Sequence, residues 1–256
     1  MKTRIRVFSS EASAAAALRK ELVETLTAPP EMGPRVIMLA GGATPIEVYG
    51  QIAEDPPDGV APGTWLLLSD DRHVPPEDDR SNYGKIHPMA VSLGIPDTRM
   101  IHPDPELDLA EAASDLGMRI ASAARSGADF DLGILGIGAD GHTASIFWPN
   151  SVPVDISFDE ADAPGSGIGS GTPRYSSADE LALAAGEHLG IERVSVSAAV
   201  LLAFRRLIFF VTGSAKRDIL KRLINAPGEF PAGRILMQHP GAEIWTDQHL
   251  GGSSEG

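Results

Sequence analysis

Short runs of apolar and β-branched residues alternate along the chain with longer segments in which apolar residues recur at helical spacing. This alternation is typical of an α/β fold with a mainly parallel sheet. The expected strands are 4–8, 35–40, 64–69, 131–137, 207–212 and 242–246. The expected helices are 12–26, 46–53, 109–124 and 216–224. We therefore predict one doubly wound, Rossmann-like domain over residues 1–256, with helices on both faces of the sheet.

The clearest helix boundary follows the apolar run 35–40. Thr44 stands where a helix N-cap is expected, Pro45 takes the first helical position, and Glu47 lies three residues after the cap. These residues match a capping box with a proline at the first helical position. We expect a helix to begin there.

Two segments show no sustained period. Residues 151–180 are acidic and rich in Gly, Pro and Ser, so we expect a flexible surface loop. The tail 251–256 is expected to be disordered. It contains a G-x-S-x-G match around Ser254, but neither a strand before the serine nor a helix after it is expected, so we reject a nucleophile elbow.

Composition narrows the classes of function. The chain has 256 residues, 43% of them hydrophobic, and no cysteine, which excludes disulfides, thiolate zinc sites and cysteine nucleophiles. A formal net charge of −14 argues against binding to nucleic acid. No apolar run approaches the roughly 20 residues of a membrane span, and the N-terminus lacks the apolar core of a signal peptide. We expect a cytoplasmic protein that contacts no membrane and needs no obligatory protein partner.

Four of the expected strands run into a polar cluster. The clusters are Gly41-Gly42-Ala43-Thr44, Asp70-Asp71-Arg72, Gly138-Ala139-Asp140-Gly141-His142 and Thr212-Gly213-Ser214-Ala215-Lys216. The carboxyl ends of parallel strands share one edge of the sheet, and ligands of open α/β proteins bind at that edge. We therefore expect the four loops to converge on one site.

The residue types in these loops suit a phosphate group. The turn 41–44 brings backbone N–H groups and a helix N-terminus close to an anion. Arg72 can hold phosphate oxygens bidentately, and Lys216 supplies a compact positive charge. Taken singly, the turn is also consistent with an ordinary strand-to-helix connection and each cation with a surface residue.

His142 is the natural general base, because an unperturbed imidazole has a pKa of about 6.5. Asp140 or another carboxylate such as Asp70 can orient its ring, and the sequence leaves that choice open. A structural histidine is one alternative. A metal site is another, although no recognised ligand spacing appears. Its ligands would come from Asp70, Asp71, His73, Asp140 and His142.

The same loop also matches G-x-G-x-x-G, at Gly136, Gly138 and Gly141. A nicotinamide site needs a helix of several turns after the glycines, and then a strand that ends in an acidic residue. Pro149 instead follows seven residues after His142, and the acidic loop comes next. We interpret the glycines as a sharp turn that presents the Asp-Gly-His segment.

Five ordered stretches carry a resemblance to a known family. They read LAGGATP, SDDRHVPPEDDRSNYG, GILGIGADGHTASIF, ERVSVS and FFVTGSAKRDIL, followed by a strand that ends IWTD. On these motifs the chain resembles the glucosamine-6-phosphate isomerase/6-phosphogluconolactonase family over most of its length. The resemblance implies phosphate binding by Gly41, Gly42, Ala43, Thr44, Arg72 and Lys216. It also implies catalysis by His142, with Asp70 at the site, and Asp140 is a further catalytic candidate beside the histidine. Arg193 and Asn82 fall within family motifs and receive no role.

The lactonase branch of the family fits better than the deaminase branch. The resemblance implies hydrolysis of 6-phospho-D-glucono-1,5-lactone to 6-phosphogluconate in the oxidative pentose phosphate pathway, with no metal or organic cofactor. The deaminases carry a glutamate shortly after the histidine, in an Asn-Glu-Pro stretch, where this chain has Ile146-Phe147-Trp148-Pro149. A deaminase of phosphorylated amino sugars and a non-catalytic sugar-phosphate binding protein are the alternatives.

Two positions depart from the usual lactonase pattern. Asp71 stands where such lactonases usually have glutamate, and Trp148 interrupts the usual Phe-Pro sequence. The role of Asp71 is therefore open.

Overall fold

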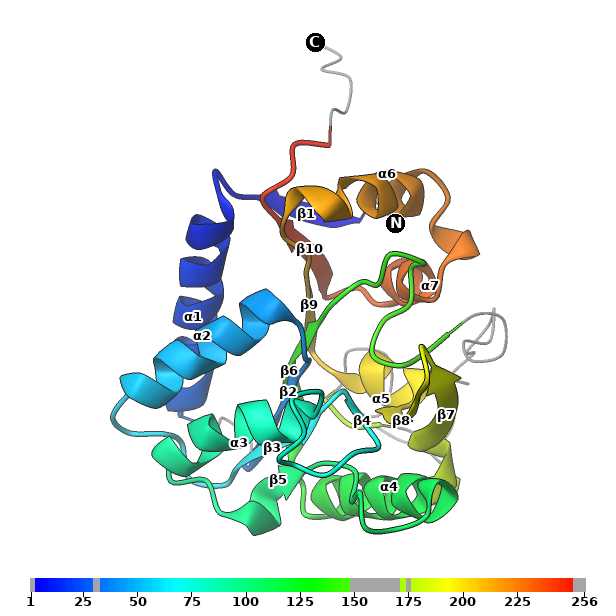
Figure 1. Cartoon of the computed structure of the whole chain (residues 1–256). Coiled ribbons are helices and arrows are strands. Elements are labelled where there is room, and N and C mark those ends of the chain that lie inside the picture. The colour runs from blue at the N-terminus through cyan, green and yellow to red at the C-terminus, as the bar shows by residue number, and fades with distance from the viewer. Residues whose placement is uncertain (1–2, 30–32, 148–170, 174–175, 251–256) are drawn as a thin grey trace.

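The structure, a computed structural model, describes residues 3–29, 33–147, 171–173 and 176–250. Within these residues seven strands form a central sheet in the order β1-β10-β9-β6-β2-β3-β5, and every pair is parallel. The strands are β1 (Arg4–Val7), β2 (Arg35–Leu39), β3 (Thr64–Leu68), β5 (Met100–Ile101), β6 (Asp129–Leu135), β9 (Arg206–Phe210) and β10 (Ala242–Thr246). Figure 1 shows this sheet edge-on through the middle of the molecule.

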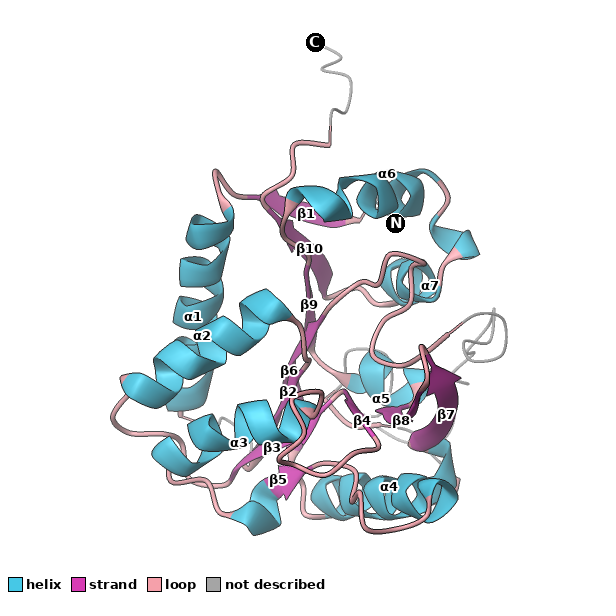
Figure 2. Ribbon diagram, in the orientation of Figure 1, coloured by secondary structure: helices cyan, strands magenta, loops and turns pink. Residues whose placement is uncertain are grey.

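Helices cover both faces of the central sheet, as Figure 2 shows. One face carries α1 (Glu11–Thr27), α2 (Ala43–Glu54) and α3 (Asn82–Ser92). The other carries α4 (Leu109–Arg125), α5 (Ala198–Ala203), α6 (Arg217–Asn225) and α7 (Pro231–Gln238). Short 3-10 helices lie at η1 (Asp97–Arg99), η2 (Ala178–Glu180), η3 (Ser214–Lys216) and η4 (Pro227–Glu229). The predicted doubly wound α/β fold is confirmed. None of the helices described is long and apolar enough to span a membrane.

Strand β2 shows how the sequence builds two cores from one sheet. Val36 and Met38 belong to the apolar cluster on the α4 face, whereas Ile37 and Leu39 belong to the cluster on the α1 face. Successive side chains of a strand point to opposite faces, so a continuous apolar run is buried on both sides. The unbroken apolar pattern of 35–40 thus reflects a central strand.

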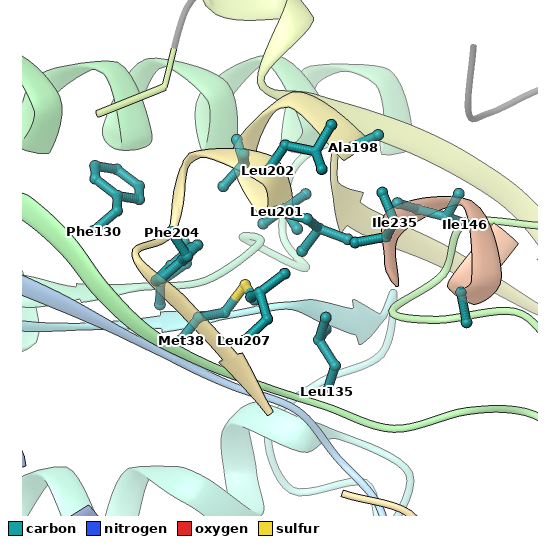
Figure 3. Packing of buried hydrophobic residues seen from close by; sticks show 14 of the residues in the cluster. Met38, Phe130, Leu135, Ile146, Ala198, Leu201, Leu202, Phe204, Leu207 and Ile235 are labelled. Carbon is teal, nitrogen blue, oxygen red and sulfur yellow. The ribbon is translucent and has the colours of Figure 1, made fainter. Parts of the chain in front are cut away.

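The cluster on the α4 face anchors the loops that follow β6 and β9. Figure 3 shows Leu135 of β6 and Leu207 of β9 packed near Leu201 of α5 and Ile235 of α7. The rings of Phe130 and Phe204 meet edge to face nearby, with centroids 5.3 Å apart. This dense packing holds the carboxyl ends of both strands in place.

A small antiparallel sheet, which the sequence pattern does not predict, stands beside the central one. It consists of β4 (Asp70–Arg72), β8 (Ile191–Val196) and β7 (Ala182–His188), in that order. The β7–β8 hairpin turns through Leu189 and Gly190, whose positive φ angles of 55° and 76° are typical of a tight hairpin. The hairpin places Arg193 opposite Arg72 of β4, and it places His188 at the end of β7.

The predicted capping box at Thr44 is wrong. Helix α2 begins at Ala43, and its N-cap is Gly42, at a φ of 112° that glycine adopts readily. The N–H of Ile46 donates to the Gly42 carbonyl over 3.1 Å. The Thr44 hydroxyl instead donates to the carboxylate of Glu11 on α1. A tertiary contact has therefore replaced the local cap.

Several sequence-based predictions concern residues outside those described. The predicted flexible loop 151–180 falls mostly outside them, and its described part contains η2 at 178–180. The tail 251–256, with Ser254, and the departure at Trp148 also lie outside the described residues.

Candidate active site

The four polar clusters line one cleft of about 500 Å³ at the carboxyl ends of β2, β3, β6 and β9. Its volume is within the range of small-molecule sites. The predicted site residues that line it are Gly41, Gly42, Ala43, Thr44, Asp70, Arg72, His142 and Lys216. The expected convergence of the four loops is confirmed, while the roles assigned to the residues stay predictions.

The close approach of the Asn82 side chain explains why the turn after β2 begins with a glycine, Gly41. A Cβ on Gly41 would lie 2.2 Å from the Oδ1 atom of Asn82, so only glycine fits without displacement. The Asn82 amide donates to the Asp70 carbonyl over 3.0 Å and accepts from the Arg72 guanidinium over 3.2 Å. The side chain of Asn82 thus joins the turn to β4 and gives this family-motif residue a structural place at the site.

Three cations face the cleft, and among the described residues no carboxylate forms an ion pair with any of them. Arg72 donates to the carbonyl of Arg80, and Lys216 donates to the carbonyl of Ile137 over 2.7 Å. Arg193 is only 8% exposed, and the buried Nε atoms of both Arg72 and Arg193 have no hydrogen-bond partner. Burial, and then the charge of Arg72, lower the pKa of Arg193. Within the described residues none of the three cations forms an ion pair, an arrangement that favours an anionic ligand.

Among the described residues, Asp71 binds backbone N–H groups and the Ser81 hydroxyl, and it forms no ion pair with a cation. Its carboxylate accepts from the N–H groups of Arg72 (2.8 Å), Asn82 (2.6 Å) and Tyr83 (2.9 Å). Burial raises the pKa of Asp71 to about 6, although these hydrogen bonds act in the opposite direction. Asp71 therefore holds the N-terminus of α3 against β4, which gives the position a structural role.

The carboxylate of Asp70 binds two serine hydroxyls. Ser69 donates to it over 2.9 Å and Ser145, in the loop after β6, donates over 2.6 Å. The backbone N–H of Ser145 also donates to Ser195 on β8 over 3.1 Å. Asp70 therefore fixes the loop after β6 to the small sheet and makes no hydrogen bond to His142 in the described structure.

Asp140 is the carboxylate that orients His142. Its Oδ1 atom lies 2.5 Å from the His142 Nδ1 atom and 3.2 Å from the His142 backbone nitrogen. Partial burial raises the pKa of Asp140, but the hydrogen bonds and charge of His142 outweigh burial, and the net pKa is lowered. An ionised Asp140 requires the proton on Nδ1, which leaves Nε2 as the basic nitrogen. The structure thus answers the question that the sequence left open.

Gly138 and Gly141 leave the space that the hydrogen bond between Asp140 and His142 requires. A Cβ on Gly138 would lie 2.1 Å from the Cε1 atom of His142 and 2.7 Å from the Oδ1 atom of Asp140. Gly141, at a φ of 88°, permits the turn between them, and a Cβ there would lie 2.3 Å from the ring of Phe230. These contacts support the interpretation of the glycines as a tight turn.

His188 is a site residue that sequence reasoning missed. Its ring stacks on Phe147 with centroids 4.2 Å apart and lies edge-on to His142 at 5.5 Å. Burial, followed by the charges of Arg193 and His142, lowers the pKa of His188. The residue reaches the cleft only because β7 and β8 form a hairpin. The signals that could have indicated this hairpin are Gly190 and the alternation of Val194 and Val196 with polar residues.

The group that could hold a metal ion differs from the set expected from the sequence. Ligand atoms of Asp140, His142 and His188 lie within 4.8 Å of one another. Asp70 and Asp71 are engaged with hydroxyl and backbone N–H groups instead. In the described part of the chain, a metal would therefore have to compete with the hydrogen bond between Asp140 and His142.

The fold and the cleft define a doubly wound α/β protein in which three cations, without ion pairs in the described part of the chain, share a cleft with a histidine that an aspartate holds. A family model described as glucosamine-6-phosphate isomerases/6-phosphogluconolactonase matches residues 9–163. The chain belongs to this family, which confirms the resemblance seen in the motifs.

Relatives and solved structures agree with this membership. The human 6-phosphogluconolactonase is 32% identical, over 94% of this chain and 89% of its own. The Haemophilus influenzae 6-phosphogluconolactonase is 30% identical, over 83% of this chain and 84% of its own. The Thermotoga maritima 6-phosphogluconolactonase structure covers 96% of this chain and 99% of its own, with a TM-score of 0.71 and 24% identity. A monomeric glucosamine-6-phosphate deaminase has a TM-score of 0.66 and 16% identity, with 95% and 96% covered. The two structures show that the fold is shared by both activities.

Proposed function

We propose that this protein is a 6-phosphogluconolactonase, which hydrolyses 6-phospho-D-glucono-1,5-lactone to 6-phosphogluconate in the oxidative pentose phosphate pathway. The observation that carries the proposal is the positive charge of Arg72, Arg193 and Lys216, unpaired within the described residues, in the same cleft as His142, which Asp140 contacts. The names of the relatives indicate the same reaction.

The substrate phosphate binds at the turn 41–44 and is held by Arg72, Arg193 and Lys216. Backbone N–H groups at the start of α2 and the guanidinium groups complement phosphate oxygens. Anchoring the phosphate places the lactone carbonyl near His142. Positioning of this kind can lower a barrier by several kcal/mol.

His142 acts as a general base and then as a general acid. Its Nε2 atom takes a proton from water while the water oxygen forms a bond to the lactone carbonyl carbon. When the bond between that carbon and the ring oxygen breaks, the imidazolium returns the proton to the ring oxygen. Asp140 stabilises the imidazolium through Nδ1. Asp70, which is held by Ser145, contacts sugar hydroxyls and does not orient the histidine.

The chemistry of the site favours a lactonase over an amino-sugar deaminase. The residues that follow His142 are Thr143, Ala144, Ser145 and Ile146, none of which is a carboxylate. The deaminase-type ring opening and amine chemistry use an extra acid/base group there. The lactonase needs one histidine, and we propose that it works without a metal or organic cofactor. We further propose that it acts in the cytoplasm, without an obligatory protein partner or contact with membrane or nucleic acid.

The first test follows hydrolysis of freshly generated 6-phosphogluconolactone against its spontaneous decay. The wild type should accelerate hydrolysis, and His142→Ala should lower kcat by roughly 10²- to 10⁴-fold, as expected for loss of a general base. His87→Ala is the matched control, because His87 lies on α3 beside Asp97 and does not line the cleft. If the wild type does not exceed the spontaneous rate, the lactonase proposal fails. Release of ammonia from glucosamine 6-phosphate would then indicate the deaminase, and sugar-phosphate binding without turnover would indicate a binding protein.

A further inference from the structure

An acidic side chain lies inside the part of the cleft where the phosphate is expected. Glu11, in the first turn of α1, accepts hydrogen bonds from the hydroxyls of Thr44 (2.6 Å) and Thr212 (3.1 Å). The two hydroxyl oxygens are 3.2 Å apart. All three residues line the cleft, and Thr44 belongs to the turn assigned to the phosphate. The Glu11 carboxylate thus holds two donors that a phosphate oxygen would also use.

A negative charge is favourable in the first turn of α1, but the capping of that helix does not use the Glu11 carboxylate. Ser10 and Ser13 already form a reciprocal capping box at the start of α1. In the part of the chain that the structure describes, Glu11 forms no ion pair with a basic side chain. The protein groups that its carboxylate contacts are the two threonine hydroxyls, which are weaker partners than a guanidinium or an ammonium group.

The start of α2 is correspondingly open to an external anion. Its N-cap, Gly42, makes no side-chain cap hydrogen bond, and no acidic residue lies in the first turn. The N–H groups of that turn lack a partner within the helix, so they suit an anion. Glu11, which belongs to α1, contacts this end of α2 through its hydrogen bond with the Thr44 hydroxyl.

We propose that Glu11 is an affinity- and specificity-determining residue that competes with the ligand for the phosphate subsite. This inference rests on the proposed function only in placing the phosphate at residues 41–44. A hydroxyl proton can be donated to one acceptor at a time, so the phosphate gains Thr44 and Thr212 only when Glu11 gives them up. The displaced carboxylate then lies beside a second negative charge. Glu11 therefore weakens the binding of phosphorylated ligands and speeds the release of a phosphorylated product.

The test is direct binding, measured by calorimetry, of 6-phosphogluconate and of inorganic phosphate. Glu11→Gln removes the charge and keeps an oxygen acceptor for the threonines, so it should bind both probes on the order of tenfold more tightly. Gluconate, which has no phosphate, should bind both proteins alike. Glu47→Gln is the matched control, because Glu47 is exposed on α2, does not line the cleft, and carries the same charge.

Two results would overturn the inference. One is phosphate binding by Glu11→Gln that is no tighter than that of the wild type. The other is an equal gain in Glu47→Gln, which would trace the effect to net charge alone. The lactonase assay of the wild type separates this inference from the proposed function. A wild type without lactonase activity, together with tighter phosphate binding by Glu11→Gln, would remove the proposed function and leave the competition intact.

Discussion

The two ends of the central sheet differ in whether their cationic side chains form ion pairs. At the amino ends of β2, β6 and β9, three arginines face carboxylates, in the pairs Arg35–Asp131 (3.6 Å), Arg205–Asp129 (2.6 Å) and Arg206–Glu21 (2.6 Å). At the carboxyl ends, Arg72, Arg193 and Lys216 form no ion pair within the described residues. The first arrangement stabilises the folded chain, and the second leaves positive charge for a ligand to neutralise.

The hydrogen bonds of Asp70 and Asp71 explain why these two carboxylates do not pair with the cations at the carboxyl ends. Asp70 and Asp71 lie beside Arg72 in sequence, yet their oxygens are taken up by serine hydroxyls and backbone N–H groups. If either carboxylate paired with an arginine of the cleft, the charge that holds a phosphate would be neutralised. Hydrogen bonds within the protein therefore keep these two carboxylates from forming ion pairs with the cationic side chains of the cleft.

Apart from loss of His142 itself, the largest effect is expected from Gly138→Ala. The added Cβ would occupy space 2.1 Å from the His142 ring, so the imidazole must leave its hydrogen bond with Asp140. We expect kcat to fall by about 100-fold or more, because misplacement by about 1 Å is enough for such a loss. Gly50→Ala is the control, since Gly50 is exposed on α2, does not line the cleft, and has no heavy atom other than those of its own helix and chain neighbours within 4 Å of its Cβ position. Steady-state kinetics of both variants test this, and a normal kcat in Gly138→Ala would show that the pair is not required.

Asp71→Asn tests, through the pH dependence of stability, the buried carboxyl that lies beside the cleft between Asp70 and Arg72. The folded-state pKa is about 6, against an ordinary value of 3.8, so the folded state binds more protons than the unfolded state between these values. Asp71 therefore stabilises the fold less and less as pH rises from 4 to 6, by up to about 3 kcal/mol in total. The variant lacks this titration. Urea unfolding across that range should show the wild type losing stability relative to Asp71→Asn, whereas parallel curves would contradict the raised pKa.

The central sheet and its polar edge could be predicted because both depend on local sequence. Strands such as β2 are continuous apolar runs, and each of four strands is followed directly by glycine or polar residues. The pair of Asp140 and His142 is only two residues apart. Parallel topology then brings the clusters together without further information.

The remaining parts of the site depend on contacts between distant segments. Strand β7 contains alanines and a glycine, which have low strand propensity, and it forms only because it pairs with β8. The sequence pattern therefore missed the hairpin that carries His188 and buries Arg193. At Thr44 a local capping signal was overridden by Glu11, which lies 33 positions earlier in the chain.

A matched pair of substitutions tests the contrast between the two ends. Arg193→Met should weaken the binding of 6-phosphogluconate by more than about tenfold, because a charge-assisted contact is lost. Its stability should be unchanged or higher, since a buried charge without a carboxylate partner is removed. Calorimetry and urea unfolding measure both effects. A large loss of stability with normal binding would place Arg193 among structural residues.

Arg35→Met is the counterpart at the amino ends. Arg35 is buried, donates to the Thr25 carbonyl and faces Asp131, so its removal leaves a half-buried carboxylate without its cation. We expect the free energy of unfolding to fall by about 2 kcal/mol, with ligand binding unchanged. Weakened binding of 6-phosphogluconate in this variant would mean that the two ends of the sheet are not independent.

The smallest expected effect concerns the pair Arg206–Glu21, at the same end as Arg35 but nearer to solvent. The Arg206 side chain is 47% exposed, so water and salt screen the pair. Arg206→Gln should lower the free energy of unfolding by less than about 1 kcal/mol, and the loss should shrink at high salt. Urea unfolding at low and high salt provides the measurement. A larger loss that persists in salt would show that pairing at the amino ends stabilises the sheet as a connected network, because an isolated exposed pair cannot have that effect.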